Sequence, residues 1–94
     1  MNEVFRALSD PTRRRILELL KSGDLSAGEL AERFPLAKST LSGHFNVLKQ
    51  ARLVVTERRG TTIVYSLNLS ALEETAAAVL ELLSRRRRRK EGSR

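Results

Sequence analysis

Residues 38–50, KSTLSGHFNVLKQ, have the length and periodicity of a helix but an unusual distribution of side chains. At about 100° per residue, Leu41, Phe45 and Leu48 share one face, which is the spacing of a buried apolar stripe. The opposite face is made of small residues, and polar or cationic side chains flank the seam between the two faces. The small residues are Ser39, Ser42, Gly43 and Asn46, and the flanking residues are Lys38, Thr40, His44 and Lys49.

A slim face of hydroxyl, amide and backbone groups is poorly suited to burial. It is well suited to the major groove of DNA, where a helix must approach base edges closely. The pattern alone leaves a second interpretation open, in which the face is merely solvated. His44 also has two interpretations: a partly buried imidazole that bonds a backbone carbonyl, or a donor to a DNA phosphate. A lone histidine has no partner ligands for a metal ion.

The residues before this helix predict a helix-turn-helix. Ser26 and Glu29 have the spacing of a capping box, which starts a short helix. Pro35 ends that helix because it disfavours helical geometry at the preceding residue. The four residues 34–37 then form the turn, and the short helix with this turn would hold residues 38–50 in a groove.

The residues after this helix predict a basic hairpin. Residues 52–68, RLVVTERRGTTIVYSLN, alternate as two strands around a turn at residues 58–61. Arg58 and Arg59 lie in the turn, where they could reach a neighbouring minor groove, although they could also be ordinary surface charges.

The two ends of the chain predict three further helices. A short one spans residues 2–8, and a second begins with Asp10 as its N-cap and Pro11 in its first turn. A last helix begins with a capping box at Ser70 and Glu73 and runs at least to Ser84. The predicted architecture is mainly α with a β-hairpin wing, in the order α-α-α-α-β-β-α.

Charge is sorted along the chain. The ten residues 85–94 carry a net charge of +6, whereas the other 84 residues carry only +1. Within that part, residues 33–67 carry six basic residues and one acidic residue, so the middle third is electropositive. We therefore divide the chain into a domain at residues 1–84 and a basic tail at 85–94, which is either a helix extension or disordered.

Composition limits the classes of function. The chain of 94 residues holds no cysteine and no apolar run long enough to span a membrane, so we expect a cytoplasmic protein without disulfides or membrane insertion. A core of this size is marginal alone, which favours self-association. The chain shows no nucleophile–base pair, metal ligand set or phosphate-binding loop, so we expect neither an enzyme nor a cofactor.

Four blocks of the sequence together resemble the ArsR-type winged helix-turn-helix repressors, and most closely the SdpR-like autorepressors. The blocks are FRALSDPTRRRILELL, LSAGELAERF, STLSGHFNVLKQARLV and RRGTTIVYSLN, which fall in family order within residues 3–70. The resemblance implies a homodimeric bacterial repressor that binds a pseudo-palindromic DNA operator. It also implies that the residues around the seam of 38–50, together with Arg58 and Arg59, contact DNA.

The resemblance further implies a dimer interface made by the first and last helices. The last helix carries an apolar stripe that the small domain offers little to cover. The interface residues expected from the two helices are Val4, Phe5, Leu8, Leu72, Ala76, Val79, Leu80 and Leu83.

The sequence departs from the family pattern in three ways, and these change what we expect of DNA recognition and of regulation. Gly43 stands where family members often carry a longer side chain, so base readout should rest on few groups and DNA shape should contribute more. Ala37 offers no capping oxygen, so either Ser39 caps a later helix start or the first N–H groups stay open for phosphate. The cysteines and histidines of a metal sensor are absent, so regulation by a protein partner, by a small molecule in the dimer interface or by simple autorepression stays open. The resemblance to the SdpR-like proteins favours autorepression that is relieved when another protein sequesters the repressor.

A rival interpretation comes from another class of function. In it, the chain is a winged-helix module whose positive face binds an acidic protein partner instead of DNA.

Overall fold

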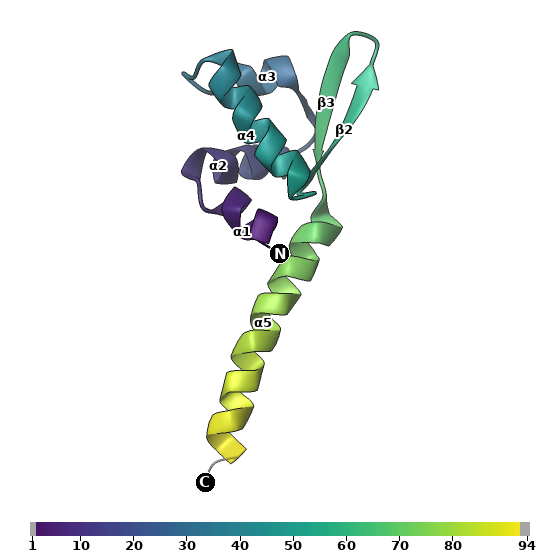
Figure 1. The fold of residues 1–94 in the computed structure, drawn as a ribbon. Coiled ribbons are helices and arrows are strands. Elements are labelled where there is room, and N and C mark those ends of the chain that lie inside the picture. Colours follow the sequence, from purple (N-terminus) through teal and green to yellow (C-terminus); the bar gives the residue numbers. More distant parts are fainter. Residues whose placement is uncertain (1, 93–94) are drawn as a thin grey trace.

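The computed structural model describes the backbone of residues 2–92 and the side chains of residues 2–84. The basic tail, 85–94, therefore lies outside the described side chains. Within the described residues, the chain forms five helices and three strands (Figure 1). In order they are α1 (Asn2–Leu8), α2 (Pro11–Leu20), β1 (Leu25–Ser26), α3 (Ala27–Ala31), α4 (Lys38–Gln50), β2 (Val54–Arg59), β3 (Thr62–Leu67) and α5 (Leu69–Gly92). The predicted order of helices and hairpin is confirmed, with one short strand added.

Local sequence signals set where α2 and α3 begin. Asp10 is the N-cap of α2, and its carboxylate accepts a hydrogen bond from the Arg13 backbone N–H at 3.1 Å. Ser26 and Glu29 make the reciprocal bonds of a capping box, at 3.0 Å and 2.9 Å, as their spacing predicts. These caps satisfy N–H groups that have no partner within the helix.

The added strand, β1, pairs antiparallel with β3, so the sheet order is β1-β3-β2. Leu25 pairs with Tyr65, and Ser26 pairs with Val64. Two residues are too few to show the alternation that identifies a strand in sequence. Ser26 is also the cap of α3, so a single residue ends the strand and starts the helix.

The connection between α3 and α4 is longer than predicted. It spans six residues, 32–37, because α3 ends at Ala31. Arg33 and Phe34 donate to carbonyls three residues back, at 3.0 Å and 3.4 Å, which tightens the chain into a turn before Pro35. The helix therefore ends earlier than the proline alone requires.

The hairpin is tighter than predicted. Arg59 still pairs with Thr62, which leaves only Gly60 and Thr61 in the turn. Gly60 has a φ of +64°, a conformation that glycine adopts without the steric cost of a side chain. Arg58 and Arg59 consequently lie in β2, and the prediction that they belong to the turn is wrong.

The start of α5 is also corrected. The helix begins at Leu69, so Ser70 lies inside it and cannot cap it. Asn68 takes this role, because its Oδ1 accepts from the Ala71 N–H at 3.3 Å and its Nδ2 donates to the Arg52 carbonyl at 2.8 Å. An amide can cap the helix and tie it to the preceding loop at once, which a serine hydroxyl cannot do so easily.

A single hydrophobic core is formed by residues of all four helices from α1 through α4 and of the sheet. Its most buried large side chains are Ile16, Leu30, Leu48 and Leu53. The α4 helix lies across this core next to the wing, and the rings of Phe45 and Tyr65 pack with centroids 4.7 Å apart. Burial raises the pKa of Tyr65, whose ring is the contact between α4 and β3.

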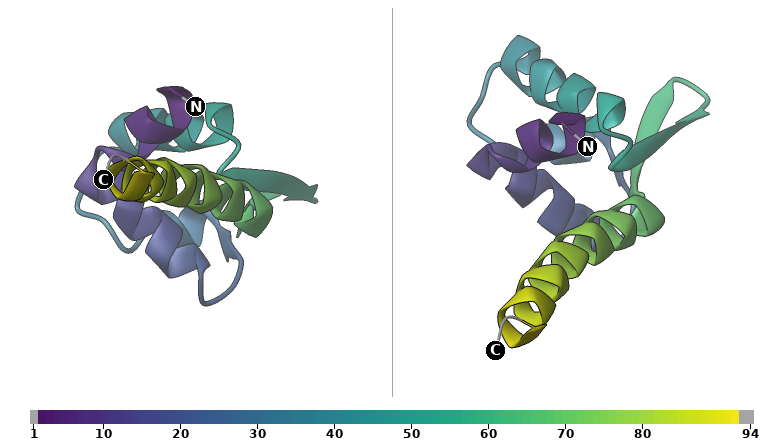
Figure 2. Two further views of the ribbon diagram at one scale, coloured as in Figure 1. Left: turned by 90° about the horizontal axis from the view of Figure 1, so that it is seen from below. Right: turned by 60° about the horizontal axis from the view of Figure 1, so that its bottom comes forward.

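The last helix extends away from the domain. The molecule measures 61 × 23 × 21 Å, and Figure 1 shows that α5 makes up most of its long axis. The two further views in Figure 2 show α5 as one continuous helix that starts beside the hairpin and projects from the rest of the domain. Within the part of the chain that the structure describes, no helix has the length and apolarity needed to span a bilayer.

Candidate DNA-binding surface

The face of α4 expected to contact DNA is open. Leu41, Phe45 and Leu48 are buried, as the stripe predicts. The residues expected at the DNA are exposed with the exception of His44, which is partly buried, and they are Lys38, Ser39, Thr40, Ser42, Gly43, Asn46 and Lys49. A Cβ placed on Gly43 meets nothing within 4 Å, so the centre of this face is free space.

The N-terminal end of α4 has no side-chain cap. The helix begins at Lys38 with Ala37 as its N-cap, and within the described part of the chain no side chain caps it. The alternative in which Ser39 caps a later start is therefore wrong. The helix starts early because Ala37 already accepts the first helical bond, from Leu41 at 3.0 Å. Open N–H groups at a helix start attract anions such as phosphate.

The two wing arginines lie on opposite faces of β2, because side chains alternate along a strand. Arg58 is two residues from Thr56, which pairs with Tyr65, so it shares the sheet face that packs on α4. Arg59 lies on the other face with Glu57, and its Nε lies 3.3 Å from the Glu57 carboxylate. This hydrogen-bonded ion pair raises the pKa of Arg59.

The ion pair of Arg59 with Glu57 makes the two wing arginines unequally available to bind another molecule. Arg59 has its charge partly neutralised by Glu57. Arg58, Lys38 and Lys49 have no ion-pair partner among the described residues. These three cations belong to the electropositive middle third of the chain.

His44 takes a position that neither interpretation of the sequence foresees. Its side chain is 16% exposed, and its Nδ1 lies 3.1 Å from Nη1 of Arg13 and 3.9 Å from the carboxylate of Asp10. The imidazole is therefore partly buried, as one interpretation expects, but the partner of its Nδ1 is a guanidinium and not a backbone carbonyl. Its other ring nitrogen makes no hydrogen bond within the described residues.

Arg13 joins three parts of the molecule. Beyond His44, its Nε donates to the Ala7 carbonyl at 3.0 Å and its Nη2 donates to the Arg6 carbonyl at 2.8 Å. Arg14 adds a bond to the Leu8 carbonyl at 2.7 Å. The positive charge that opposes the dipole of α2 thus binds the negative, C-terminal end of α1.

Two carboxylates at helix starts have lowered pKa values. Burial raises the pKa of Asp10, but hydrogen bonds from the Arg13 and Thr12 backbone N–H groups and the nearby positive charge of Arg13 together outweigh it, so the net shift is downward. Hydrogen bonds from the Ser26 backbone and hydroxyl lower the pKa of Glu29. Both groups are therefore held in the charged form that caps a helix best.

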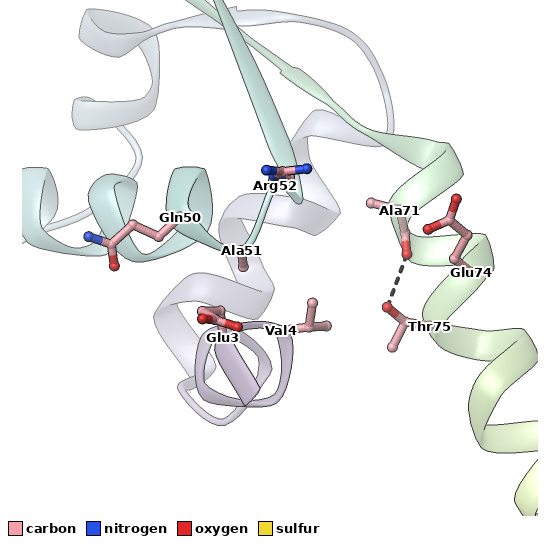
Figure 3. A pocket seen from close by; sticks show the side chains of 8 residues that line it. All are labelled: Glu3, Val4, Gln50, Ala51, Arg52, Ala71, Glu74 and Thr75. Carbon is pink, nitrogen blue, oxygen red and sulfur yellow. Dashed lines mark hydrogen bonds between the residues drawn. The ribbon is translucent and has the colours of Figure 1, made fainter. Parts of the chain in front are cut away.

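The residues expected in a dimer interface are largely uncovered. Val4, Leu8 and Leu72 are partly buried against the core, and Ala76 is exposed. The large exposed side chains are Phe5 at 48%, Val79 at 40%, Leu80 at 63% and Leu83 at 56%. Between α1, the end of α4 and α5 lies a hollow of about 400 Å³ (Figure 3), with Val4 on one wall and Ala71 and Thr75 on the other.

No cluster that could hold a metal appears on the described part of the chain, where no three His, Cys, Asp or Glu side chains come together. The single histidine is engaged with Arg13, and the sequence contains no cysteine.

A short helix, a turn, an exposed recognition helix and an antiparallel hairpin beside it define a winged helix-turn-helix, a class of DNA-binding protein. The comparisons with known proteins agree. A family model described as "Bacterial regulatory protein, arsR family" matches residues 10–56. This chain belongs to that family of DNA-binding transcriptional regulators, whose members are not enzymes.

Individual relatives support the assignment. The transcriptional repressor SdpR of Bacillus subtilis (strain 168) is 47% identical over 85 residues, which cover 90% of this chain and 94% of that protein. An arsenical resistance operon repressor of Staphylococcus xylosus is 38% identical over 73 residues, or 78% of this chain and 70% of that one. An ArsR-like transcriptional regulator from Rhodococcus sp. RHA1 superposes with a TM-score of 0.85 at 35% identity, covering 94% of this chain and 83% of that chain.

Sequence reasoning missed two residues at the surface. It did not assign Glu57 a role, although the spacing of Glu57 and Arg59 places both on one face of a strand. It did not predict the contact of Arg13 with His44, because the two residues are 31 positions apart in the sequence.

Proposed function

We propose that this protein is a homodimeric transcriptional repressor that binds a pseudo-palindromic operator, without sensing metal ions. The observation that carries the proposal is the open face of α4, where small polar groups and unpaired cations surround Gly43. A helix with such a face can approach base edges to hydrogen-bonding distance.

The residues divide by role. Ser42 and Asn46 are the base-reading groups, with Ser39 beside them, because hydroxyl and amide groups both donate and accept hydrogen bonds. Lys38, Thr40, Lys49 and the N–H groups at the start of α4 bind phosphate, which fixes the register of the helix. Gly43 reads no base but allows close approach.

The wing contact falls mainly to Arg58. An arginine on a wing responds to the width and the negative potential of the minor groove. Arg58 has no ion-pair partner among residues 2–84, whereas Arg59 must leave Glu57 before it can bind DNA.

The homodimer rests on the uncovered apolar stripe of α5. Val79 and Leu80 lie four and three residues before Leu83, so the three exposed side chains share one side of the helix, and exposed apolar side chains gathered in this way normally pack on a partner. Phe5 of α1 is exposed as well. A second copy of the chain would cover both helices and place two α4 helices on one face of a duplex.

The dimer can be tested with a matched pair of substitutions. Leu80 and Leu82 are 63% and 64% exposed but lie roughly 200° apart around α5. We expect Leu80→Gln to give a monomer in sedimentation equilibrium, and Leu82→Gln to remain a dimer. A monomeric wild-type protein, or equal effects of the two substitutions, would contradict the proposed interface.

Regulation without metal rests on chemistry. A thiophilic ion such as arsenite needs thiolate ligands, and this sequence has none. Autorepression in the cytoplasm, relieved by a protein that sequesters the repressor, is the regulation that the resemblance to the SdpR-like autorepressors implies.

Binding to the protein's own upstream DNA separates repression from the rival interpretation as a protein-binding module. We expect a discrete complex on a short inverted repeat, which Arg58→Ala weakens and Lys21→Ala, a charge-matched control at the end of α2, does not. Equal weak binding to every duplex would favour the acidic protein partner. Selection from genomic fragments with the purified protein would then identify the operator.

A further inference from the structure

The contact between Arg13 and His44 links helices that the sequence separates. We propose that Arg13 is a positioning residue for α4: it ties the end of α1 to the middle of the recognition helix and sets the orientation of the base-reading face without touching DNA. This inference rests on the proposed function, since it concerns how the reading face is held.

The first step is the geometry of the guanidinium. Its Nε and Nη2 bind the carbonyls of Ala7 and Arg6, and its Nη1 binds Nδ1 of His44, all between 2.8 Å and 3.1 Å. A planar guanidinium with three engaged nitrogens has little freedom to rotate. The end of α1 and the ring of His44 are therefore held in a fixed relation.

The second step is the position of His44 on α4. It lies between Gly43 and Phe45, so it is the residue at which the open face meets the buried face. Ser42 and Asn46 are each two residues away. A displacement of the ring would rotate this turn of the helix and move both base-reading groups.

Arg13 also sets the tautomer of the His44 imidazole. A guanidinium can only donate hydrogen bonds, so Nδ1 must accept and the ring proton of the neutral imidazole lies on Nε2. Arg13 thereby leaves Nε2–H as a donor, which agrees with the predicted bond from His44 to a phosphate.

The consequence concerns the whole dimer. Because α1 carries Phe5 of the proposed interface, Arg13 makes the orientation of α4 depend on the packing of α1. Dimer formation and operator affinity would then be coupled through this side chain, in addition to the direct packing of α1 on α4.

Two substitutions at His44 separate its two nitrogens. In His44→Asn, the amide oxygen lies near the place of Nδ1 and still accepts from Arg13. In His44→Gln, the amide lies near the place of Nε2 and the link to Arg13 is lost. We expect His44→Asn to bind the operator within about threefold of wild type and His44→Gln to lose about tenfold, the size of a typical coupling between contacting residues. The reverse order would overturn the proposal. Both variants keep the bonds from Arg13 to α1, so the test stands even if Arg13 variants fail to fold.

Variants of Arg13 test the shape of the group. We expect Arg13→Lys to weaken operator binding as much as Arg13→Gln does, because one ammonium cannot reach all three acceptors. Combined with His44→Gln, either variant should add little further loss. Full rescue by lysine would mean that only the positive charge of Arg13 matters. Additive losses in the double variant would mean that Arg13 does not act through His44. Either result would contradict the positioning role.

A measurement without DNA distinguishes failure of this inference from failure of the proposed function. In the DNA-free protein, Arg13→Lys and His44→Gln should shift the same amide resonances at the end of α1 and in α4, whereas His44→Asn should not. Shared shifts with no operator binding would overturn the repressor alone. Specific binding with no shared shifts would overturn the positioning role alone.

Discussion

Gly43 is the residue at which stability and function oppose each other most clearly. Glycine in a helix interior costs about 1 kcal/mol relative to alanine. Nothing lies within 4 Å of the position of its missing Cβ, so no steric clash requires a glycine there. The proposed function supplies a reason for the glycine, because a bare backbone allows α4 to lie close to the bases.

Gly43→Ala should therefore raise the free energy of unfolding by about 1 kcal/mol, as measured by urea denaturation. Gly28→Ala in α3 is the matched control, since its Cβ would meet the Ser26 hydroxyl at 3.9 Å, near the cap of that helix. An unchanged or lower free energy of unfolding in Gly43→Ala would contradict the view that this glycine weakens the helix.

The wing arginines predict unequal effects on binding. Arg58→Ala should cost about 1–2 kcal/mol of operator binding, roughly tenfold in affinity, and Arg59→Ala clearly less. In a Glu57→Gln background, Arg59 is released, so its removal should then matter more. Fluorescence anisotropy across a range of salt concentrations measures both effects. Equal losses for the two arginines in the wild-type background would contradict the assignment of Arg58.

At the scale of elements, the sequence predicted what local rules decide. The caps at Asp10 and Ser26 follow from side chains and backbone N–H groups within one turn, and the apolar stripe of α4 follows from its periodicity. Strand β1 could not be predicted, because its two residues are a strand only through pairing with β3, about 40 residues later in the chain. The contact of Arg13 with His44 escaped prediction for the same reason.

The start of α5 shows how two local rules can compete. Ser70 and Glu73 match the capping-box spacing, but the Asn68 side chain caps the helix two residues earlier and also binds the Arg52 carbonyl. Arg52 has a φ of +60°, and Asn68 holds this strained residue in place. The tertiary contact decides between the two candidate caps.

This correction gives a direct test on stability. Asn68→Ala should lower the free energy of unfolding by about 1–2 kcal/mol, since it removes an N-cap and a bond to the turn at Arg52. Ser70→Ala should change it by less than about 0.5 kcal/mol. Thermal denaturation of both variants checks the order, and a larger loss in Ser70→Ala would restore the capping box that the sequence suggested.

At the scale of the whole molecule, stability should depend on pH through the two helix caps. The carboxyl groups of Asp10 and Glu29 have pKa values below their ordinary values of 3.8 and 4.5. The unfolded chain therefore binds protons first as the pH falls, so the folded state loses stability from about pH 5 downward and is fully stabilised above it.

Urea unfolding at about pH 6 and about pH 3.5, on either side of the carboxyl titration, measures this loss. Asp10→Asn is the informative variant, because asparagine still caps a helix but has no carboxyl group to titrate. Its stability should fall less than that of the wild type between the two pH values. An identical fall in both proteins would place the acid sensitivity elsewhere.

The shape of the whole molecule also shows why binding and assembly belong together. The winged helix-turn-helix has its own small core, and α5 projects from it with exposed apolar side chains along its length (Figure 1). The sequence indicated both the stripe and the basic middle third, since each is a property of composition and periodicity. The relation between them through Arg13 appears only once the chain is folded.

The most direct test of the central claim is the ratio of affinities for the selected operator and for a scrambled duplex of the same length and composition. The wild-type protein should prefer the operator by at least about 10³-fold, as specific DNA-binding proteins do. Ser42→Ala and Asn46→Ala should each lower that ratio about tenfold or more while leaving affinity for the scrambled duplex unchanged. A wild-type ratio near one, or an unchanged ratio in both variants, would contradict base reading by α4.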